Sequence, residues 1–244
     1  MWKDIASASA QKRLIAFDLF GTLLDTSSIA GALRSEGVAD ASSAAQLWRR
    51  YQLEYTWRVE CMGSYIDFDE CTKRSLAHAA PDLSAEAREE VMAAYAHLEA
   101  YDDVGSAIKT LAQEGKFDLV VFTNGKSSSS DTLAGTRKMV EAAVNGSPSL
   151  APLAQYLFPP IVVDDESLRH YKPAKAAYDH VAKTFGRDAK DIWLISSNPF
   201  DIVGAKSAGW NAAWVDRAGE GWKDGLGQPD VVARSLVDLR QHIE

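Results

Sequence analysis

Cysteine is scarce in this sequence, with only Cys61 and Cys71 among 244 residues. Neither has a second cysteine or a histidine nearby at the spacing of a zinc site. Two isolated cysteines also provide no disulfide framework of the kind that holds small secreted domains together. We therefore expect neither a disulfide nor a metal ligand here, and predict that both are small buried residues of a helical segment.

Long apolar runs and excess positive charge are also absent. The first residues include Lys3 and Asp4 and do not resemble a signal peptide, and no apolar run reaches the roughly 20 residues of a membrane span. The 26 Lys and Arg residues against 34 Asp and Glu give a net charge of −8, spread along the chain. We therefore expect a cytoplasmic protein without membrane or nucleic-acid partners, in which local groups attract any small anion.

The overall composition is that of a globular protein. The sequence is 46% hydrophobic and 25% charged, which excludes fibrous and disordered classes. Its length is sufficient for a full hydrophobic core together with a small second domain.

The most informative stretch runs from Arg13 to Asp25. Residues 14–17 are apolar without a helical period, which predicts a strand covered on both faces of a parallel sheet. Gly21 allows a sharp turn just beyond Asp18, so the Asp18 carboxylate would lie at the strand end where such sheets bind ligands. Taken alone, the pattern is equally consistent with Asp18 capping a turn or helix.

The rest of the chain predicts an α/β fold with an insertion. Residues 26–103 have helical spacing, for example at Leu47, Tyr51 and Tyr55, and Ser84 can cap a helix that reaches Leu98. Further strands are expected at 119–122, 161–163, 192–195 and 212–215, with helices at 106–114, 136–145 and 174–185. This alternation predicts a parallel sheet in a core of residues 1–25 and 104–244, with a helical cap domain formed by residues 26–103.

The wording Phe-Asp-Leu-Phe-Gly-Thr-Leu-Leu-Asp at 17–25 resembles the first motif of the haloacid dehalogenase (HAD) superfamily, whose leading Asp is a covalent nucleophile. The resemblance implies a Rossmann-like HAD core with an inserted helical cap, and Asp18 as the nucleophile. Phosphatases of the superfamily carry a second Asp two positions later as general acid. Phe20 occupies that position here and has no proton to donate, which indicates the 2-haloacid dehalogenase branch.

Three later sites match the same superfamily in the same order. Thr123 at a strand end resembles the second-motif Ser or Thr, and Lys172, followed by a proline that can begin a helix, resembles the third-motif Lys. Taken alone, each is more often a structural Thr at a strand end or a surface Lys. The stretch 196–201, Ser-Ser-Asn-Pro-Phe-Asp, resembles the dehalogenases, which work without metal, because Ser197 stands where phosphatases have a magnesium-binding acid.

A fifth match covers residues 47–57, which resemble the cap helix of the dehalogenases. The resemblance implies that Arg49 lies over the nucleophile and receives the departing halide. Arginine suits this role because its positive charge does not vary with pH. The alternative is a solvated or ion-paired helix residue. Arg50 departs from the expected Gln and would add a second cation near the mouth of the site.

The resemblance implies hydrolytic dehalogenation of short (S)-2-haloalkanoic acids to (R)-2-hydroxyalkanoic acids, without a cofactor. Asp18 would attack C2 and expel halide toward Arg49 and Asn124, and water would then cleave the Asp18 ester. Thr123 and the backbone amides of Leu19 and Phe20 would bind the substrate carboxylate.

Further residues receive supporting roles from the same resemblance. Lys172 would stabilise the charged form of Asp18, while Asp201, fixed by Ser196 and Asn198, would orient Lys172 and the hydrolytic water. Tyr178 would support this network, or would simply be a packing residue of its helix. An apolar wall for the alkyl chain would consist of Phe20, Leu53, Phe68 and Phe200. His170 would lie near the site.

Two other functions stay open at the level of sequence. A HAD hydrolase could act on another small electrophile or a phosphate ester, and an inherited fold could serve a non-catalytic binding protein. A homodimer is expected from the resemblance and from the aromatic-rich segment 47–57, which offers more apolar surface than one core can cover.

Overall fold

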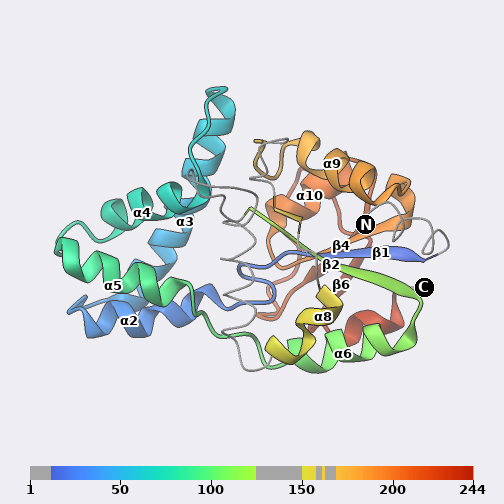
Figure 1. Cartoon of the computed structure of the whole chain (residues 1–244), viewed down its shortest axis with the longest axis horizontal. Helices are drawn as coiled ribbons and strands as arrows, with labels where there is room; N and C mark the ends of the chain where they lie inside the picture. The colour runs from blue at the N-terminus through green and yellow to red at the C-terminus, as the bar shows by residue number, and fades with distance from the viewer. Residues whose placement is uncertain (1–11, 125–149, 158–160, 163–168, 244) are drawn as a thin grey trace.

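A computed structural model describes residues 12–124, 150–157, 161–162 and 169–243. Six parallel strands form one sheet in the order β3-β2-β1-β4-β5-β6 (Figure 1), which is the order of a doubly wound Rossmann-like fold. The strands are β1 (Arg13–Phe17), β2 (Phe117–Thr123), β3 (Ile161–Val162), β4 (Ile192–Ser196), β5 (Asn211–Val215) and β6 (Val231–Ala233). The predicted α/β class and parallel sheet are confirmed.

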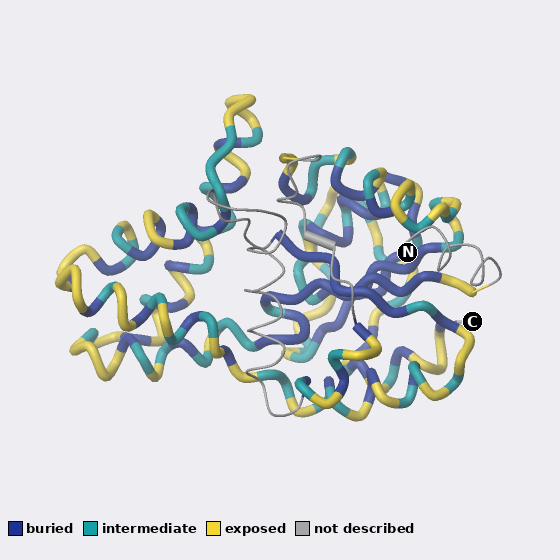
Figure 2. The backbone as a smooth tube through the Cα atoms, in the orientation of Figure 1, coloured by how far each residue is buried: buried dark blue, intermediate teal, exposed yellow. Residues whose placement is uncertain are grey.

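Helices cover both faces of this sheet. In Figure 1, α9 and α10 lie on one side of the strands and α6 and α8 on the other. Figure 2 shows the central strands as the most continuously buried part of the chain, as expected for a sheet covered on both faces. The elements are α6 (Val104–Glu114), α8 (Ala154–Leu157), α9 (Lys175–Phe185), α10 (Pro199–Ser207) and the 3₁₀ turns Ala151–Leu153, Ala189–Asp191 and Asp238–Gln241.

A group of helices between β1 and α6, hereafter the helical insertion, lies beside the sheet (Figure 1). It contains the 3₁₀ turn Thr26–Ile29 and the helices α2 (Ala30–Ser35), α3 (Ala41–Cys61), α4 (Phe68–Ala79) and α5 (Ala85–Tyr95). Side chains of Asp40, Asp67 and Ser84 accept hydrogen bonds from the first turns of α3, α4 and α5. Trp48 of α3 is buried and donates through Nε1 to Thr72 O of α4 at 2.9 Å, which fixes the packing of the two helices.

The chain enters and leaves the helical insertion at neighbouring points. Leu24 and Ala100 form an antiparallel bridge, and Asp25 N donates to Glu99 O at 2.7 Å. Tyr101 N donates to Leu23 O at 3.2 Å. The two passages are therefore held together directly after the turn that follows Asp18.

Several boundaries and burial predictions differ from the structure. Cys71 is buried as predicted, but Cys61 is exposed because it is the last residue of α3. The helix predicted at 174–185 begins at Lys175, so Pro173 precedes it, and the helix predicted from Ser84 to Leu98 ends at Tyr95. The predicted helix 136–145 and Val163 lie outside the described residues. Among the described helices, none is both long and apolar enough to cross a bilayer.

Candidate active site

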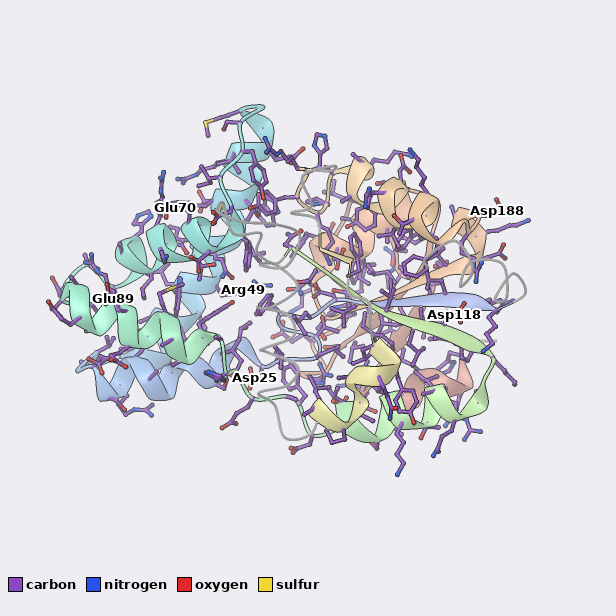
Figure 3. The ribbon with its side chains drawn as sticks, viewed as in Figure 1. Asp25, Arg49, Glu70, Glu89, Asp118 and Asp188 are labelled. Carbon is purple, nitrogen blue, oxygen red and sulfur yellow. The ribbon has the colours of Figure 1, made fainter. Side chains whose placement is uncertain are left out.

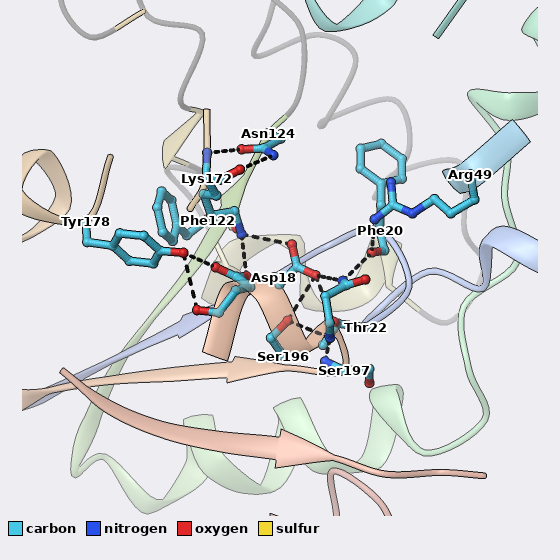
Figure 4. Close-up of polar contacts among 12 residues, drawn as sticks. Asp18, Phe20, Thr22, Arg49, Phe122, Asn124, Lys172, Tyr178, Ser196 and Ser197 are labelled. Atoms are coloured by element: carbon cyan, nitrogen blue, oxygen red, sulfur yellow. Dashed lines mark hydrogen bonds and ion pairs between the residues drawn. The ribbon is translucent and has the colours of Figure 1, made fainter. Parts of the chain in front are cut away.

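Asp18 lies immediately after β1 with its side chain turned into a dense set of donors (Figure 4). Its Oδ2 accepts hydrogen bonds from Asn198 Nδ2 at 2.6 Å, Thr22 Oγ1 at 2.9 Å and Ser196 Oγ at 3.4 Å. Its Oδ1 accepts from Lys172 Nζ at 3.0 Å. The residue is only 4% exposed, so these donors replace the water that a carboxylate would otherwise bind.

Lys172 is buried among acceptors that match the three protons of its ammonium group. Nζ donates to Asp201 Oδ2 at 2.7 Å, to Phe122 O at 2.9 Å and to Asp18 Oδ1. Burial alone would lower the pKa of Lys172, but the carboxylates of Asp18 and Asp201 outweigh it and the pKa is raised. Lys172 is therefore a fixed cation beside the Asp18 carboxylate.

Asp201 and Tyr178 form the inner end of this network. The Tyr178 hydroxyl donates to Asp201 Oδ1 at 2.7 Å, and both side chains are buried. Burial, reinforced by the charge of Asp18, raises the pKa of Asp201 to about 6, while Lys172 and the Tyr178 hydrogen bond lower it. Burial also holds the pKa of Tyr178 well above its usual value, so Tyr178 remains a proton donor to Asp201.

The supporting roles of Ser196 and Asn198 differ from the sequence prediction. Both side chains donate to Asp18, and Asn198 N donates to Ser196 Oγ at 3.0 Å. Asn198 holds Asp201 through the backbone, where Asp201 N donates to Asn198 O at 3.1 Å. Asn198 Nδ2 also donates to Phe20 O at 3.0 Å. Asn198 precedes α10, so its side chain reaches back to the turn after β1, while its carbonyl oxygen accepts from Asp201 N in the first turn of α10.

Arg49 reaches from α3 to the turn that carries Asp18. Figure 3 shows it on the side of the helical insertion that faces the sheet. Its Nη2 donates to Phe20 O at 3.0 Å, and its Nη1 donates to Gln52 Oε1 at 2.7 Å. Arg49 is thus brought to the loop that follows Asp18, whereas Arg50 is exposed on α3.

Thr123 and Asn124 end β2, the strand beside β1. The Thr123 hydroxyl is buried and has no hydrogen-bond partner among the described residues, so it is available to a ligand oxygen. Asn124 instead uses its Oδ1 to accept from Lys172 N at 2.9 Å. Asn124 therefore holds the backbone of Lys172, a contact that was not expected from the sequence.

The residues predicted to form an apolar wall lie in two separate groups. Phe20 stacks with Phe68 at 5.6 Å between ring centroids and with Tyr95 at 5.5 Å. Phe200 instead meets Trp57 of α3 edge-on at 5.4 Å, and Leu53 is half-buried on the same helix. Leu19 is buried beside Asp18. His170 is exposed, with Nδ1 2.8 Å from Glu60 Oε1 at the far end of α3.

Three residues of the site were missed from the sequence. Thr22 accepts from Ser197 N at 2.9 Å while donating to Asp18, and its place four residues after Asp18 in the first motif was an available signal. Gln52 contacts Arg49 from the next turn of α3. Arg217 donates to Thr22 O at 3.0 Å and Ser197 Oγ at 3.1 Å, and no sequence pattern pointed to a residue so far along the chain.

The residues at this site do not fit a magnesium ion of the kind that HAD phosphatases bind. The Lys172 ammonium forms ion pairs with both Asp18 and Asp201, so the charge of these two carboxylates is already balanced by a side chain. The Arg217 guanidinium donates to the Ser197 hydroxyl, which replaces the expected acid. Among the residues that the structure describes, no group of three acidic, histidine or cysteine side chains could hold a metal ion.

Comparisons with known proteins agree with this geometry. The sequence profile of the haloacid dehalogenase-like hydrolases matches residues 12–209. Haloacetate dehalogenase H-2 of Moraxella sp. (strain B) is 30% identical over 233 residues, covering 94% of this chain and 96% of that protein. An (S)-2-haloacid dehalogenase of Pseudomonas sp. (strain YL) is also 30% identical, over 91% of this chain and 90% of its own length.

Solved structures give the same result. An L-2-haloacid dehalogenase of Xanthobacter autotrophicus, with chloropropionic acid covalently bound, superposes with a TM-score of 0.80 at 25% identity. The superposition covers 96% of this chain and 100% of that one.

Proposed function

The chain belongs to the haloacid dehalogenase-like hydrolases, and within them we propose that it hydrolyses short (S)-2-haloalkanoic acids to (R)-2-hydroxyalkanoic acids and halide. The observation that carries the proposal is the surroundings of Asp18. A buried carboxylate has Lys172 on one oxygen, while Arg49 reaches the same loop from α3. This arrangement suits a nucleophile that attacks carbon and releases an anion toward a fixed cation.

The first step forms one bond and breaks one. An oxygen of Asp18 attacks C2 of the substrate from the side opposite the halogen, and the electron pair of the carbon–halogen bond leaves with the halide toward Arg49. The product of this step is an Asp18 ester with inverted configuration at C2. Arg49 suits halide departure because guanidinium stays protonated at every relevant pH.

The second step returns the enzyme to its starting state. Water attacks the Asp18 carbonyl carbon and the ester oxygen leaves with C2, giving the hydroxy acid. Lys172 and Asp201 orient this water, and Asp201 receives its proton, since Asp201 has a pKa near the working range. Thr22, Ser196 and Asn198 stabilise the charge that develops on the other Asp18 oxygen.

Substrate binding follows from the charges and donors around Asp18. Lys172 faces two carboxylates, and Arg49 forms no ion pair with a carboxylate among the described residues. The substrate carboxylate would be bound by the free Thr123 hydroxyl and the backbone amides of Leu19 and Phe20. The stacked rings of Phe20, Phe68 and Tyr95 and the pair Trp57 and Phe200 would enclose the short alkyl chain.

The proposal includes a division into two parts. Residues 1–25 and 104–244 would form the catalytic core and residues 26–103 a helical cap that supplies Arg49. The paired passages at Leu24 and Ala100 support this boundary, because every described helix between them belongs to the helical insertion.

A halide-release assay tests the function. Purified protein is incubated with (S)- and (R)-2-chloropropionate, and chloride and lactate are measured, with Asp18→Asn as the control. We expect chloride and (R)-lactate from the (S) substrate only, and none from the variant. The proposal fails if no halide is released from either enantiomer, from chloroacetate or from 2-bromopropionate. The protein would then be better explained as a non-catalytic binding protein or as a hydrolase of other electrophiles.

We also propose that the protein is a homodimer. Large apolar side chains are exposed along α3, with Leu47 37%, Trp57 36% and Met62 68% exposed. Covering them with a second copy would remove this surface from water. Light scattering at assay concentration should give twice the chain mass, and a monomer mass would exclude the dimer.

A further inference from the structure

Gln52 is the partner of Arg49 on its own helix and is almost fully buried, at 1% exposed. Its Oε1 accepts hydrogen bonds from Arg49 Nη1 at 2.7 Å and from the Tyr95 hydroxyl at 3.1 Å. Its Nε2 donates to Thr72 Oγ1 at 2.8 Å. Three helices, α3, α4 and α5, therefore contribute to the position of one amide beside the arginine.

The orientation of the Gln52 amide is fixed by its neighbours. The Thr72 hydroxyl donates its only proton to Phe68 O at 2.6 Å, so Thr72 Oγ1 can only accept from Gln52. The Gln52 NH₂ group must therefore face Thr72, and its oxygen must face Arg49 and Tyr95. Burial raises the pKa of Tyr95, so its hydroxyl stays a donor to the same oxygen.

A glutamine at this position holds the guanidinium without neutralising it. A carboxylate of the same shape would form a buried ion pair with Arg49, because Nη1 already lies within hydrogen-bond distance. Such a pair would reduce the attraction of Arg49 for a departing anion. The neutral amide fixes the direction of the guanidinium and leaves its positive charge for a ligand.

We infer that Gln52 is a positioning residue, which aims the Arg49 guanidinium at the departing halide and preserves its charge. The inference rests on the proposed function, since it assigns Gln52 to the halide-release step. It predicts that a change at Gln52 affects substrates according to their leaving group. Chloride leaves less readily than bromide, so the chloro substrate depends more on Arg49.

The test compares Gln52→Glu with Gln46→Glu, which adds the same charge at an exposed position of α3. Turnover of (S)-2-chloropropionate and (S)-2-bromopropionate is measured for both variants and for the unchanged protein. For Gln52→Glu, we expect kcat on the chloro substrate to fall by about 100-fold, with a several-fold smaller loss on the bromo substrate. Gln46→Glu should retain both rates and their ratio.

Failure of the inference and failure of the function give different results. If the unchanged protein releases no halide from either substrate, the proposed function fails. If it is active and Gln52→Glu keeps both rates, or loses them in equal proportion, the positioning role is wrong. Should Gln52→Glu not fold, Gln52→Met, which keeps the volume and lacks the acceptor, replaces it, and an unchanged chloro-to-bromo ratio in that variant overturns the inference.

Discussion

At the scale of single residues, the two oxygens of Asp18 have different surroundings. Oδ2 accepts from Thr22, Ser196 and Asn198, whereas Lys172 is the one donor to Oδ1 within the part of the chain that the structure describes. An oxygen with one donor retains more of its lone-pair density for attack on carbon. We therefore expect Oδ1 to form the bond to C2, while the three donors at Oδ2 stabilise the ester and its hydrolysis.

Isotope labelling tests whether Asp18 makes the first bond. In a single turnover in H₂¹⁸O with enzyme in excess, water attacks the ester carbonyl, so the label should enter Asp18 and the hydroxy acid should stay unlabelled. Mass spectrometry of the Asp18 peptide and of the product measures both. The Asp18→Asn variant should lose activity by a factor on the order of 10⁴ or more. Label found only in the product would show that water attacks C2 directly, and the covalent mechanism would be wrong.

The pH dependence of activity depends on Asp201. Its pKa of about 6 means that it is ionised at neutral pH and becomes protonated as the pH falls through that value. Protonated Asp201 can neither balance Lys172 nor accept a proton, so kcat should decline on the acid side near pH 6. Tyr178→Phe removes a hydrogen bond that favours ionised Asp201. The acid limb of the profile should therefore move to higher pH in this variant.

The control for that prediction is Tyr156→Phe, which removes a hydroxyl from a partly exposed tyrosine of α8. Its pH profile should match that of the unchanged protein. An acid limb that stays in place in Tyr178→Phe, or moves to lower pH, would mean that Asp201 does not set it.

The sequence predicted which residues form the site more reliably than it predicted their contacts. Asp18 and Thr123 lie at the carboxyl ends of the neighbouring parallel strands β1 and β2, which share one edge of the sheet. Lys172 donates to both Asp18 and Asp201 there. Which acceptor each donor contacts depends on differences of a few ångströms in the positions of the turns. The order of residues in the sequence does not give these positions. Asn198 was therefore expected at Asp201 and is found at Asp18.

At the scale of secondary-structure elements, α9 and α10 pack closely because of one glycine. A Cβ atom at Gly204 of α10 would lie 2.3 Å from the Tyr178 hydroxyl and 2.8 Å from Pro173 Cβ. Tyr178 in turn donates to Asp201. The absence of a side chain at Gly204 thus allows the tyrosine to reach the catalytic network.

We expect Gly204→Ala to reduce the free energy of unfolding by about 1–3 kcal/mol, because the added methyl group overpacks the helix contact. The matched control is Gly31→Ala in α2, where a Cβ atom would meet nothing within 4 Å. That substitution should be neutral or stabilise by up to about 1 kcal/mol, since alanine favours helices. Urea unfolding measures both. Equal stability of the two variants would contradict the proposed close packing at Gly204.

Elements with long apolar runs were predicted well, and the strand at 161–162 was also expected, whereas β6 was not. The apolar runs of β1, β2, β4 and β5 are long enough to be recognised as buried strands. The three-residue strand β6 was missed because its pairing with β5, rather than its own pattern, makes it a strand. On α3 the aromatic repeat at Tyr51 and Tyr55 is only half-buried, and smaller residues such as Ala45 lie in the core.

At the scale of the whole molecule, Arg217 connects parts of the chain that the sequence could not relate. Its guanidinium forms an ion pair with Asp103 at 2.9 Å and lies 3.9 Å from the centre of the Tyr101 ring. It also donates to Thr22 O and Ser197 Oγ. One side chain after β5 therefore links the passage out of the helical insertion with two loops around Asp18. Such a contact forms only in the assembled fold, so no local pattern in the sequence indicates it.

The same arrangement leads to a prediction about metal dependence. Lys172 pairs with Asp18 and Asp201, and Arg217 donates to Ser197, so fixed positive charge already lies beside these carboxylates and at the position where phosphatases have a metal-binding acid. The side chains of Lys172 and Arg217 already provide the positive charge that stabilises the reaction, and they would repel a further cation. Halide release should therefore proceed at the same rate after EDTA treatment and with added Mg²⁺. A magnesium-dependent phosphatase assayed in parallel verifies that chelation is complete. Loss of activity in EDTA that Mg²⁺ restores would mean that these two cations do not replace the metal.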